Sequence, residues 1–432
     1  MITHDPTEYI KGLQQLLVSD KKRVAFLFGA GTSLAKKDKD KSISIPAIGK
    51  MTSDIENKLN ENEDYRNAIK EIKEEITNQK LVYNIETLLS NIEQKINIMG
   101  AGELNGLKKK QFEEILNEIK KQVREIVSVH KEILKNDNIN HLIHKYFAKW
   151  IGKSDRKHPV EIFTTNYDYL FELGLEAHKI PYYDGFSGSY QPFFNPDSVD
   201  NLNFIPNQTK LWKLHGSLGW HLNGDTKQVL RKDSDSDDIL IYPSILKYDE
   251  SKKQPYTALM DRLSSFLKEP DTVLITCGYS FGDEHINDRI ITALNTNTTA
   301  HVIALFYDIN KNADKTEYLL TENSALSVLA KSNGKLSIFA CKNAVIGGQY
   351  GKWKLKREPD KDDAITLDKY FDSDAPIDTD APKKVGETPS EKTGEEKWTG
   401  EGELSLPDFA KFVNFLESMI VDNNLFGGYK VE

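Results

Sequence analysis

The sequence has few of the residues on which several protein classes depend. It contains only two cysteines, Cys277 and Cys341, which are too few for a disulfide-rich scaffold and wrongly spaced for a four-ligand zinc site. Both lie in apolar runs, so we expect buried free thiols, in keeping with a reducing cytoplasm. No apolar run reaches the ~18 residues that a membrane span needs, and the first residues lack a basic and apolar signal segment. These absences predict a soluble cytoplasmic protein.

An excess of basic charge is also missing. The 432 residues include 57 Lys and Arg and 66 Asp and Glu, which gives a net charge of −9. A nucleic-acid-binding protein usually has a basic excess, so we do not expect direct, sequence-specific binding of DNA or RNA. Hydrophobic residues make up 38% of the chain and charged residues 28%. This balance supports packed cores, and the length predicts two or three structural units.

Short apolar runs alternate with amphipathic stretches along much of the chain. The runs predict strands at residues 24–27, 160–166, 211–216, 239–243, 273–278, 301–307 and 335–341. The amphipathic stretches between them predict helices at 168–178, 256–267, 283–294 and 316–330. Strand–helix alternation of this kind predicts an α/β fold with a Rossmann-like parallel sheet and helices on both faces.

Three segments depart from this alternation. In residues 51–150 apolar side chains recur at three- and four-residue steps, which predicts an all-helical module inserted between the two parts of the Rossmann-like domain, residues 1–50 and 151–356. Residues 357–403 are rich in Asp, Glu, Lys, Pro and Thr and predict an acidic, polar linker. Residues 404–432 carry an apolar helical stripe, which predicts a helix that docks either on its own domain or on a partner subunit.

A glycine-rich turn follows the first predicted strand of the sheet. Its residues are Gly29, Ala30, Gly31, Thr32 and Ser33. Glycines at the end of a strand let the backbone approach a ligand closely, and the free N–H groups of a following helix favour phosphate. The turn therefore predicts a dinucleotide phosphate site. The dehydrogenase form of the motif has a third glycine where this chain has Leu34, and an ordinary strand-to-helix turn is the alternative.

Polar groups follow three further predicted strands. They are Thr165, Asn166 and Asp168 after one strand, His215 after another, and Gly278, Ser280 and Asp283 after a third. Parallel strands place their carboxyl ends at one edge of a sheet, where ligands bind, so we expect these groups to meet the glycine-rich turn. Each has an ordinary structural alternative. Asn166 fits a turn residue, Asp168 and Asp283 fit helix caps, and His215 fits a hydrogen-bonded interior histidine.

As an ordered set, these motifs resemble the sirtuins. The resemblance covers residues ~20 to 345 and rests on Gly-Ala-Gly-x-Ser, Thr-x-Asn-x-Asp, His-Gly and the later glycine–serine turn. The forms at residues 164–168 and 279–287 look most similar to bacterial sirtuin-like subunits of antiphage defence systems, in particular to the partners of HerA-like ATPases. Deacylating sirtuins carry a four-cysteine zinc ribbon that this chain lacks. The resemblance therefore implies an NAD+ hydrolase that depletes NAD+ during infection, with a HerA-like ATPase partner, a homo-oligomeric assembly and no metal.

The expected chemistry assigns a role to each group. Breaking the nicotinamide–ribose bond builds positive charge on the ribose, and nicotinamide leaves without a strong acid. Asn166 is expected to hold water or a ribose hydroxyl, His215 to act as base, and Asp168 to position the substrate or cap its helix. The substrate-binding prediction comprises Gly29, Ala30, Gly31, Thr32, Ser33, Thr165, Gly278, Ser280 and Asp283. NAD+ is then a substrate and no separate cofactor is implied. A protein deacylase and a non-catalytic NAD- or ADP-ribose-binding scaffold remain the alternatives.

Overall fold

One large sheet forms the centre of the protein. The computed structural model describes residues 2–37, 43–154, 156–232, 254–312, 315–360, 363, 366–373 and 399–420. Within these residues ten strands form the sheet, in the order β1 (Thr3–His4), β18 (Gln349–Trp353), β17 (Asn343–Ile346), β16 (Leu336–Ala340), β13 (His301–Phe306), β12 (Thr272–Cys277), β2 (Arg23–Phe28), β5 (Glu161–Thr164), β9 (Thr209–Lys213) and β6 (Tyr182–Tyr183). Neighbouring strands are parallel except for β16–β17 and β17–β18. The predicted Rossmann-like α/β fold is confirmed.

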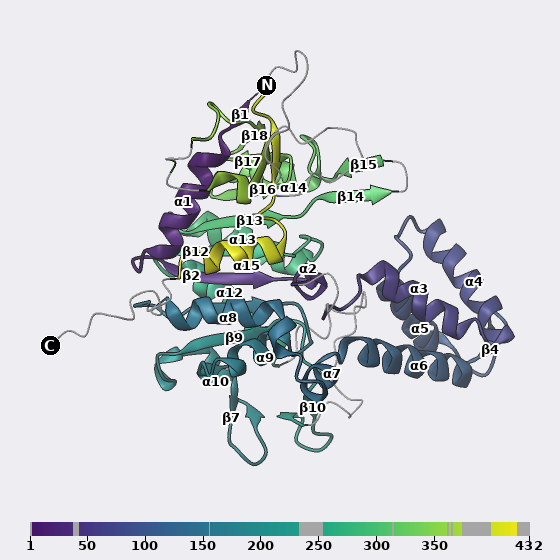
Figure 1. Ribbon diagram of the computed structural model, residues 1–432. Helices are drawn as coiled ribbons and strands as arrows, with labels where there is room; N and C mark the ends of the chain where they lie inside the picture. The colour runs from purple at the N-terminus through teal and green to yellow at the C-terminus, as the bar shows by residue number, and fades with distance from the viewer. Residues whose placement is uncertain are drawn as a thin grey trace.

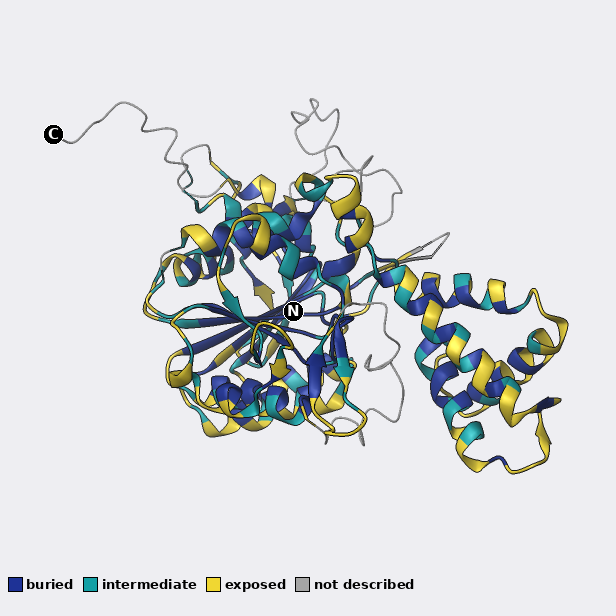
Figure 2. Cartoon of the chain, turned by 90° about the horizontal axis from the view of Figure 1, so that it is seen from below, coloured by how far each residue is buried: buried dark blue, intermediate teal, exposed yellow. Residues whose placement is uncertain are grey.

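Helices cover both faces of this sheet (Figures 1 and 2). One face packs against α1 (Pro6–Val18), α8 (Ile143–Lys153), α9 (Leu170–Ala177) and α15 (Phe409–Glu417). The other packs against α10 (Pro196–Asp200), α12 (Tyr256–Lys268), α13 (Glu284–Thr296) and α14 (Ala325–Ser332). The sequence of β2 is continuously apolar because helices cover both faces of the strand. Phe26 and Phe28 face the first layer, and Leu27 faces the second. Of the helices in the described ranges, none has both the length and the apolar character needed to cross a membrane.

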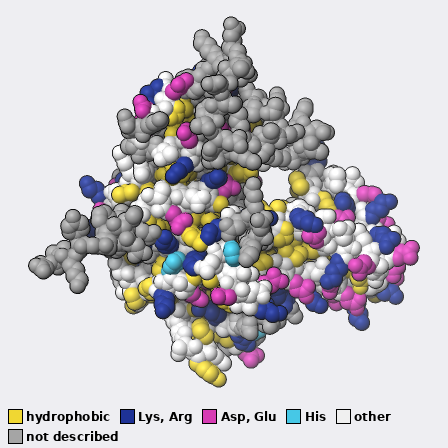
Figure 3. Space-filling view, in the orientation of Figure 1, with side chains coloured by type: hydrophobic (Ala, Val, Ile, Leu, Met, Phe, Trp, Pro, Cys, Tyr) yellow, Lys and Arg dark blue, Asp and Glu magenta, His cyan; other side chains and the backbone are white. Residues whose placement is uncertain are grey.

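A helical module projects to one side of the sheet (Figure 1). It comprises α3 (Ile48–Leu59), α4 (Glu63–Asn78), α5 (Ile85–Ile98), the hairpin of β3 (Glu103–Leu104) and β4 (Leu107–Lys108), α6 (Lys109–Val127) and α7 (His130–Lys135). The module has its own apolar core, and basic and acidic side chains alternate over its surface (Figure 3). Helix α8, which we had expected to belong to the module, packs on the sheet instead, because Phe147 lies against Phe26 and Phe28.

Short elements connect these layers. They are α2 (Ala30–Leu34), η1 (Ile139–His141), η2 (Leu202–Phe204), and a small sheet of β7 (Phe186–Ser187), β8 (Phe193–Phe194), β10 (Trp220–Leu222) and β11 (Val229–Arg231). The helix predicted at 316–330 was partly wrong: β14 (Ile309–Asn312) and β15 (Lys315–Tyr318) form a hairpin there, and the helix α14 begins only at Ala325. Backbone pairing with β14 outweighs the local helical pattern. The strand predicted at 239–243 lies outside the described residues.

The C-terminal part returns to the sheet. Within the predicted linker 357–403, the structure describes η3 (Leu367–Lys369) and β19 (Phe371–Ser373), and β19 pairs with β20 (Gly402–Leu404). Helix α15 then packs on α8 of the same chain, and its Phe409 lies against Phe28 and Phe147. Residues 374–398 and 421–432 lie outside the described residues. Of the two docking alternatives, the described helix takes the one within its own chain.

Candidate functional site

The four polar turns predicted from the sequence lie side by side at one edge of the sheet. They are the glycine turn after β2 (residues 29–34), the asparagine turn after β5 (165–169), the histidine turn after β9 (214–219) and the serine turn after β12 (278–283). Their strands are consecutive in the sheet, in the order β12, β2, β5 and β9. The strands also end in register: Phe28 pairs with Cys277 and with Thr164, and Thr164 pairs with Lys213. Parallel topology therefore brings the four turns together.

The glycine and serine turns touch backbone to backbone. The N–H of Gly31 donates to the carbonyl of Gly278 at 3.0 Å. A Cβ on Gly29 would lie 2.5 Å from the carbonyl oxygen of Gly278, and a Cβ on Gly278 would lie 2.6 Å from the nitrogen of Thr32. Gly278 has φ of +65°, a conformation that favours glycine. The glycines at these positions therefore allow two turns to approach each other.

Asn166 joins the asparagine turn to the glycine turn. Its side chain is buried, and its Nδ2 lies 3.0 Å from the carbonyl oxygen of Gly29, 3.1 Å from Oγ1 of Thr32 and 2.8 Å from Oγ of Ser33. Its backbone N–H donates to Oγ1 of Thr164 at 3.0 Å. An amide with these contacts fixes the conformation of the glycine turn. The amide nitrogen of Asn166 is thus engaged within the protein, and its Oδ1 is the atom left for a ligand.

Asp168 makes a second connection between the same turns. Its Oδ2 accepts a hydrogen bond from Oγ of Ser33 at 2.6 Å, and its Oδ1 accepts from the N–H of Leu170 at 3.0 Å. Asp168 therefore supports the start of α9, which is one of the two roles that the sequence suggested, and it also holds Ser33 of the glycine turn. Thr32 and Ser33 are buried, and the Thr32 hydroxyl donates to the carbonyl of Gly29 at 2.9 Å. These hydroxyls point into the protein rather than toward solvent.

His215 connects the histidine turn to the serine turn. Its Nε2 lies 2.9 Å from Oδ2 of Asp283, and both side chains are 13% exposed. Asp283 also caps α13, since its Oδ1 accepts from the N–H groups of His285 and Ile286. The carboxylate thus holds the imidazole by one oxygen while the other is fixed by a helix. When Nε2 carries the proton, Nδ1 of His215 is the basic nitrogen.

The remaining predicted residues lie nearer the surface of the same edge. Ala30 and Ser280 are exposed, and Thr165 and Gly278 are half-buried. Oγ of Ser280 accepts a long hydrogen bond, 3.4 Å, from the N–H of Gly282. Together with the imidazole of His215, these residues offer hydroxyl and backbone groups to a ligand at the rim of the four turns.

Sequence reasoning missed two buried charged residues beneath this edge. Lys213, the last residue of β9, contacts Glu172 of α9 at 2.6 Å. The sequence does contain a signal for this pair: Lys213 is a lysine in an otherwise apolar strand close to His215, and lysine is rarely buried without a partner.

Tyr279 was also not predicted as a site residue. Its hydroxyl donates to Oδ1 of Asn287 at 2.9 Å and supports the serine turn.

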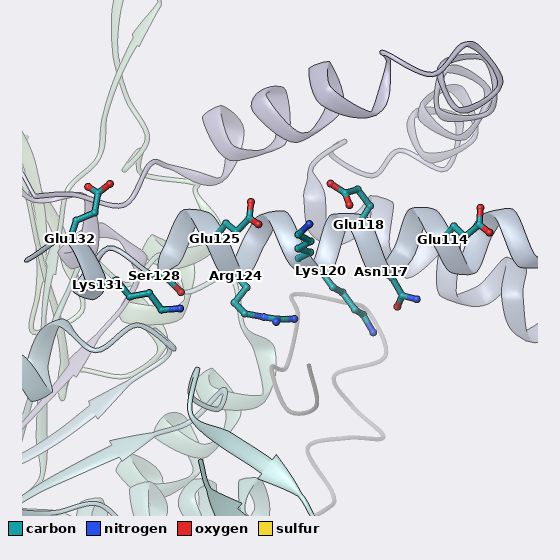
Figure 4. Close-up of a pocket in the computed structure, with 10 residues that line it drawn as sticks. Glu114, Asn117, Glu118, Lys120, Arg124, Glu125, Ser128, Lys131 and Glu132 are labelled. Carbon is teal, nitrogen blue, oxygen red and sulfur yellow. The ribbon is translucent and has the colours of Figure 1, made fainter. Parts of the chain in front are cut away.

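A separate pocket lies along the helical module. Figure 4 shows side chains of α6 and α7, among them Lys120, Arg124 and Lys131, around this pocket. None of the predicted site residues lines it. Among the described residues, no group of three or more His, Cys, Asp or Glu side chains is placed to hold a metal ion.

Part of the chain that includes much of this edge is similar to a known protein family. Residues 160–328 match a family model described as SIR2-like domain, and no curated protein matches the chain. The matched residues include the asparagine, histidine and serine turns. The glycine turn lies before them, but its strand β2 pairs with both β5 and β12 of the matched part. Residues 160–328 are thus similar to a SIR2-like domain, and this similarity is consistent with NAD-related activity.

Proposed function

We propose that this protein is an NAD+ glycohydrolase, which uses water to cleave NAD+ into nicotinamide and ADP-ribose. The observation that carries the proposal is the continuous chain of contacts that links the four turns. Asn166 joins the glycine and asparagine turns, the His215–Asp283 pair joins the histidine and serine turns, and the Gly31–Gly278 contact joins the serine and glycine turns. Such a rigid edge suits one extended dinucleotide.

The proposed reaction needs little acid catalysis. Nicotinamide leaves as a neutral base, while positive charge develops on the ribose. In the proposal, His215 takes a proton from water or from a ribose hydroxyl, and Asp283 orients its ring and stabilises the charged imidazole. The amide oxygen of Asn166 orients the attacking water or a ribose hydroxyl. Asp168 acts through Ser33 to keep the glycine turn in place.

The substrate contacts follow from which groups remain accessible. Ala30 and the adjoining backbone of the glycine turn are proposed to face the phosphates, and Gly278 and Ser280 the adenosine side. Thr165 follows β5, on the other side of the glycine turn from the serine turn, and is proposed to contact the ribose near nicotinamide. NAD+ is in this proposal the substrate, so no further cofactor or metal takes part.

We extend the proposal to a biological role. The motif resemblance supports a cytoplasmic effector of antiphage defence, which depletes NAD+ and halts growth of the infected cell. A HerA-like ATPase is the proposed controlling partner, and a homo-oligomer the proposed assembly. A strain carrying this protein and its neighbouring genes should lower phage titre, and Asn166→Ala should abolish that protection while leaving uninfected growth unchanged.

The direct experiment measures NAD+ turnover. The protein, purified with its partner, should release nicotinamide, and Asn166→Ala and His215→Ala should each reduce turnover at least about 100-fold. His301→Ala is the matched control, because His301 is an exposed residue at the first position of β13, away from the four turns. Unchanged turnover in both site variants would remove the proposed site. Release that requires an acyl-lysine peptide would indicate a deacylase, and tight NAD+ binding without turnover a scaffold.

A further inference from the structure

A buried ammonium group lies beneath the asparagine and histidine turns. It belongs to Lys213, whose side chain is 4% exposed. Its Nζ contacts the backbone carbonyl of Asp168, Oε1 of Glu172 at 2.6 Å and Oγ of Ser217 at 3.2 Å. An ammonium has three N–H groups, so these three acceptors use its full donor capacity.

The three acceptors come from different parts of the site. Asp168 belongs to the asparagine turn, Ser217 to the histidine turn, and Glu172 to α9, which follows the asparagine turn. A backbone hydrogen bond from Leu218 to Tyr167, 3.0 Å long, runs between the same two turns. Lys213 therefore joins the segment that carries Asn166 to the segment that carries His215.

Glu172 completes this arrangement at an energetic cost. Its side chain is 12% exposed, and its Oε2 is buried without a hydrogen-bond partner among the described residues. Burial raises the pKa of Glu172, whereas the Lys213 ammonium opposes that shift. Buried ion pairs contribute little net stability and are often replaceable by apolar residues. Net stability therefore does not explain this buried pair. What distinguishes the pair is that its cation contacts both the asparagine turn and the histidine turn.

We propose that Lys213 and Glu172 form a positioning pair that sets the separation and orientation of Asn166 and His215. Lys213 pulls the carbonyl of Asp168 and the hydroxyl of Ser217 toward one point, and Glu172 holds the ammonium at that point. Neither residue touches the substrate in this proposal. The inference rests on the proposed NAD+ hydrolysis only for its kinetic consequence, because the geometric consequence is measurable without substrate.

The same sheet provides a matched control. Arg262 of α12 forms a buried ion pair with Glu161 at 2.7 Å, and its side chain is 5% exposed. Glu161 is the first residue of β5, whereas the asparagine turn follows the last residue of the same strand. Breaking this pair leaves an uncompensated buried charge, as breaking Lys213–Glu172 does, but at the opposite end of the strand.

The first test is kinetic. Lys213→Met should lower kcat about 100-fold, as expected for a misplacement of about 1 Å between reacting groups, and change KM less than about threefold. Lys213→Arg keeps the charge and donors and should recover part of kcat, and Glu172→Gln should lie between the wild type and Lys213→Met. Arg262→Met should lower the melting temperature but leave kcat of the folded protein unchanged. An unaltered kcat in Lys213→Met, or an equal loss in Arg262→Met, would overturn the proposal.

The second test needs no turnover and separates this inference from the proposed function. Hydrogen exchange followed by mass spectrometry should show residues 165–169 and 214–218 exchanging at least about tenfold faster in Lys213→Met, with β13 unchanged. If Lys213→Met does not fold, Glu172→Gln and Lys213→Arg are measured in the same way. A wild-type protein that shows no NAD+ turnover when purified with its partner would contradict the proposed function, whereas unchanged exchange in these turns would contradict the positioning pair.

Discussion

The imidazole of His215 is held 2.9 Å from the carboxylate of Asp283, although the two residues are 68 positions apart in the sequence. The carboxylate is itself fixed at the start of α13. A histidine held in this way has Nε2 committed to the carboxylate, and this contact fixes the orientation of its ring.

This relationship predicts that Asp283 acts on turnover through His215 as well as capping its helix. Asp283→Asn preserves an acceptor for the cap but removes the charge, so we expect stability within about 1 kcal/mol of the wild type and kcat lowered roughly 100-fold. Asn84→Ala, which removes the cap of α5 in the helical module, is the control and should affect stability only. Equal kcat in Asp283→Asn and wild type would assign Asp283 to capping alone.

The contact between the glycine and serine turns gives a second prediction. Gly278→Ala places a Cβ 2.6 Å from the nitrogen of Thr32, at a residue with φ of +65°. We expect a loss of more than about 1 kcal/mol in unfolding free energy and a loss of turnover, because the backbones must separate. Gly347→Ala separates the two causes: Gly347 has φ of +58° but nothing within 4 Å. Similar losses in both variants would mean that backbone strain, not the contact, matters.

A buried histidine predicts how stability depends on pH. His144 packs edge-on against Phe171 and beside Phe409, both its ring nitrogens lack a partner among the described residues, and burial lowers its pKa from 6.5 to about 3. Between these pKa values the unfolded chain binds a proton that the folded protein does not, so stability should fall with decreasing pH. The expected slope is roughly 1 kcal/mol per pH unit below about pH 6.

His144→Phe removes the titrating group and keeps an aromatic ring at the position. Urea unfolding of both proteins between pH 7.5 and 5 should show that the variant gains stability relative to wild type as the pH falls. Parallel pH profiles would show that the imidazole is accessible to protons in the folded protein.

The C-terminal helix predicts a long-range effect on the core. Phe412 is fully buried, and its ring centroid lies 6.1 Å from that of Phe26 in β2. Phe412→Ala should cost about 3–5 kcal/mol of unfolding free energy, whereas Asn414→Ala, at an exposed position of the same helix, should change it by less than about 0.5 kcal/mol. A small effect of Phe412→Ala, measured by chemical denaturation, would contradict docking of α15 on its own domain.

The order of elements was largely predictable, because apolar strands and amphipathic helices carry local periodic signals. Helix α8 was assigned to the wrong unit since its amphipathic pattern does not say which surface its buried face meets. The hairpin of β14 and β15 was missed because its stability comes from pairing two segments, and neither has a strong pattern of its own.

The sequence by itself determined which residues follow the central strands, and the parallel order of those strands then requires their turns to share one edge. Only the tertiary structure decided which side chains meet. Asn166 contacts Gly29 across 137 positions, Ser33 turns inward to Asp168, and Lys213 takes Glu172 as its partner. Which groups form hydrogen bonds depends on the distance between donor and acceptor and on burial in the folded protein. The spacing of residues within one segment does not determine its distance from a segment so far away in the sequence.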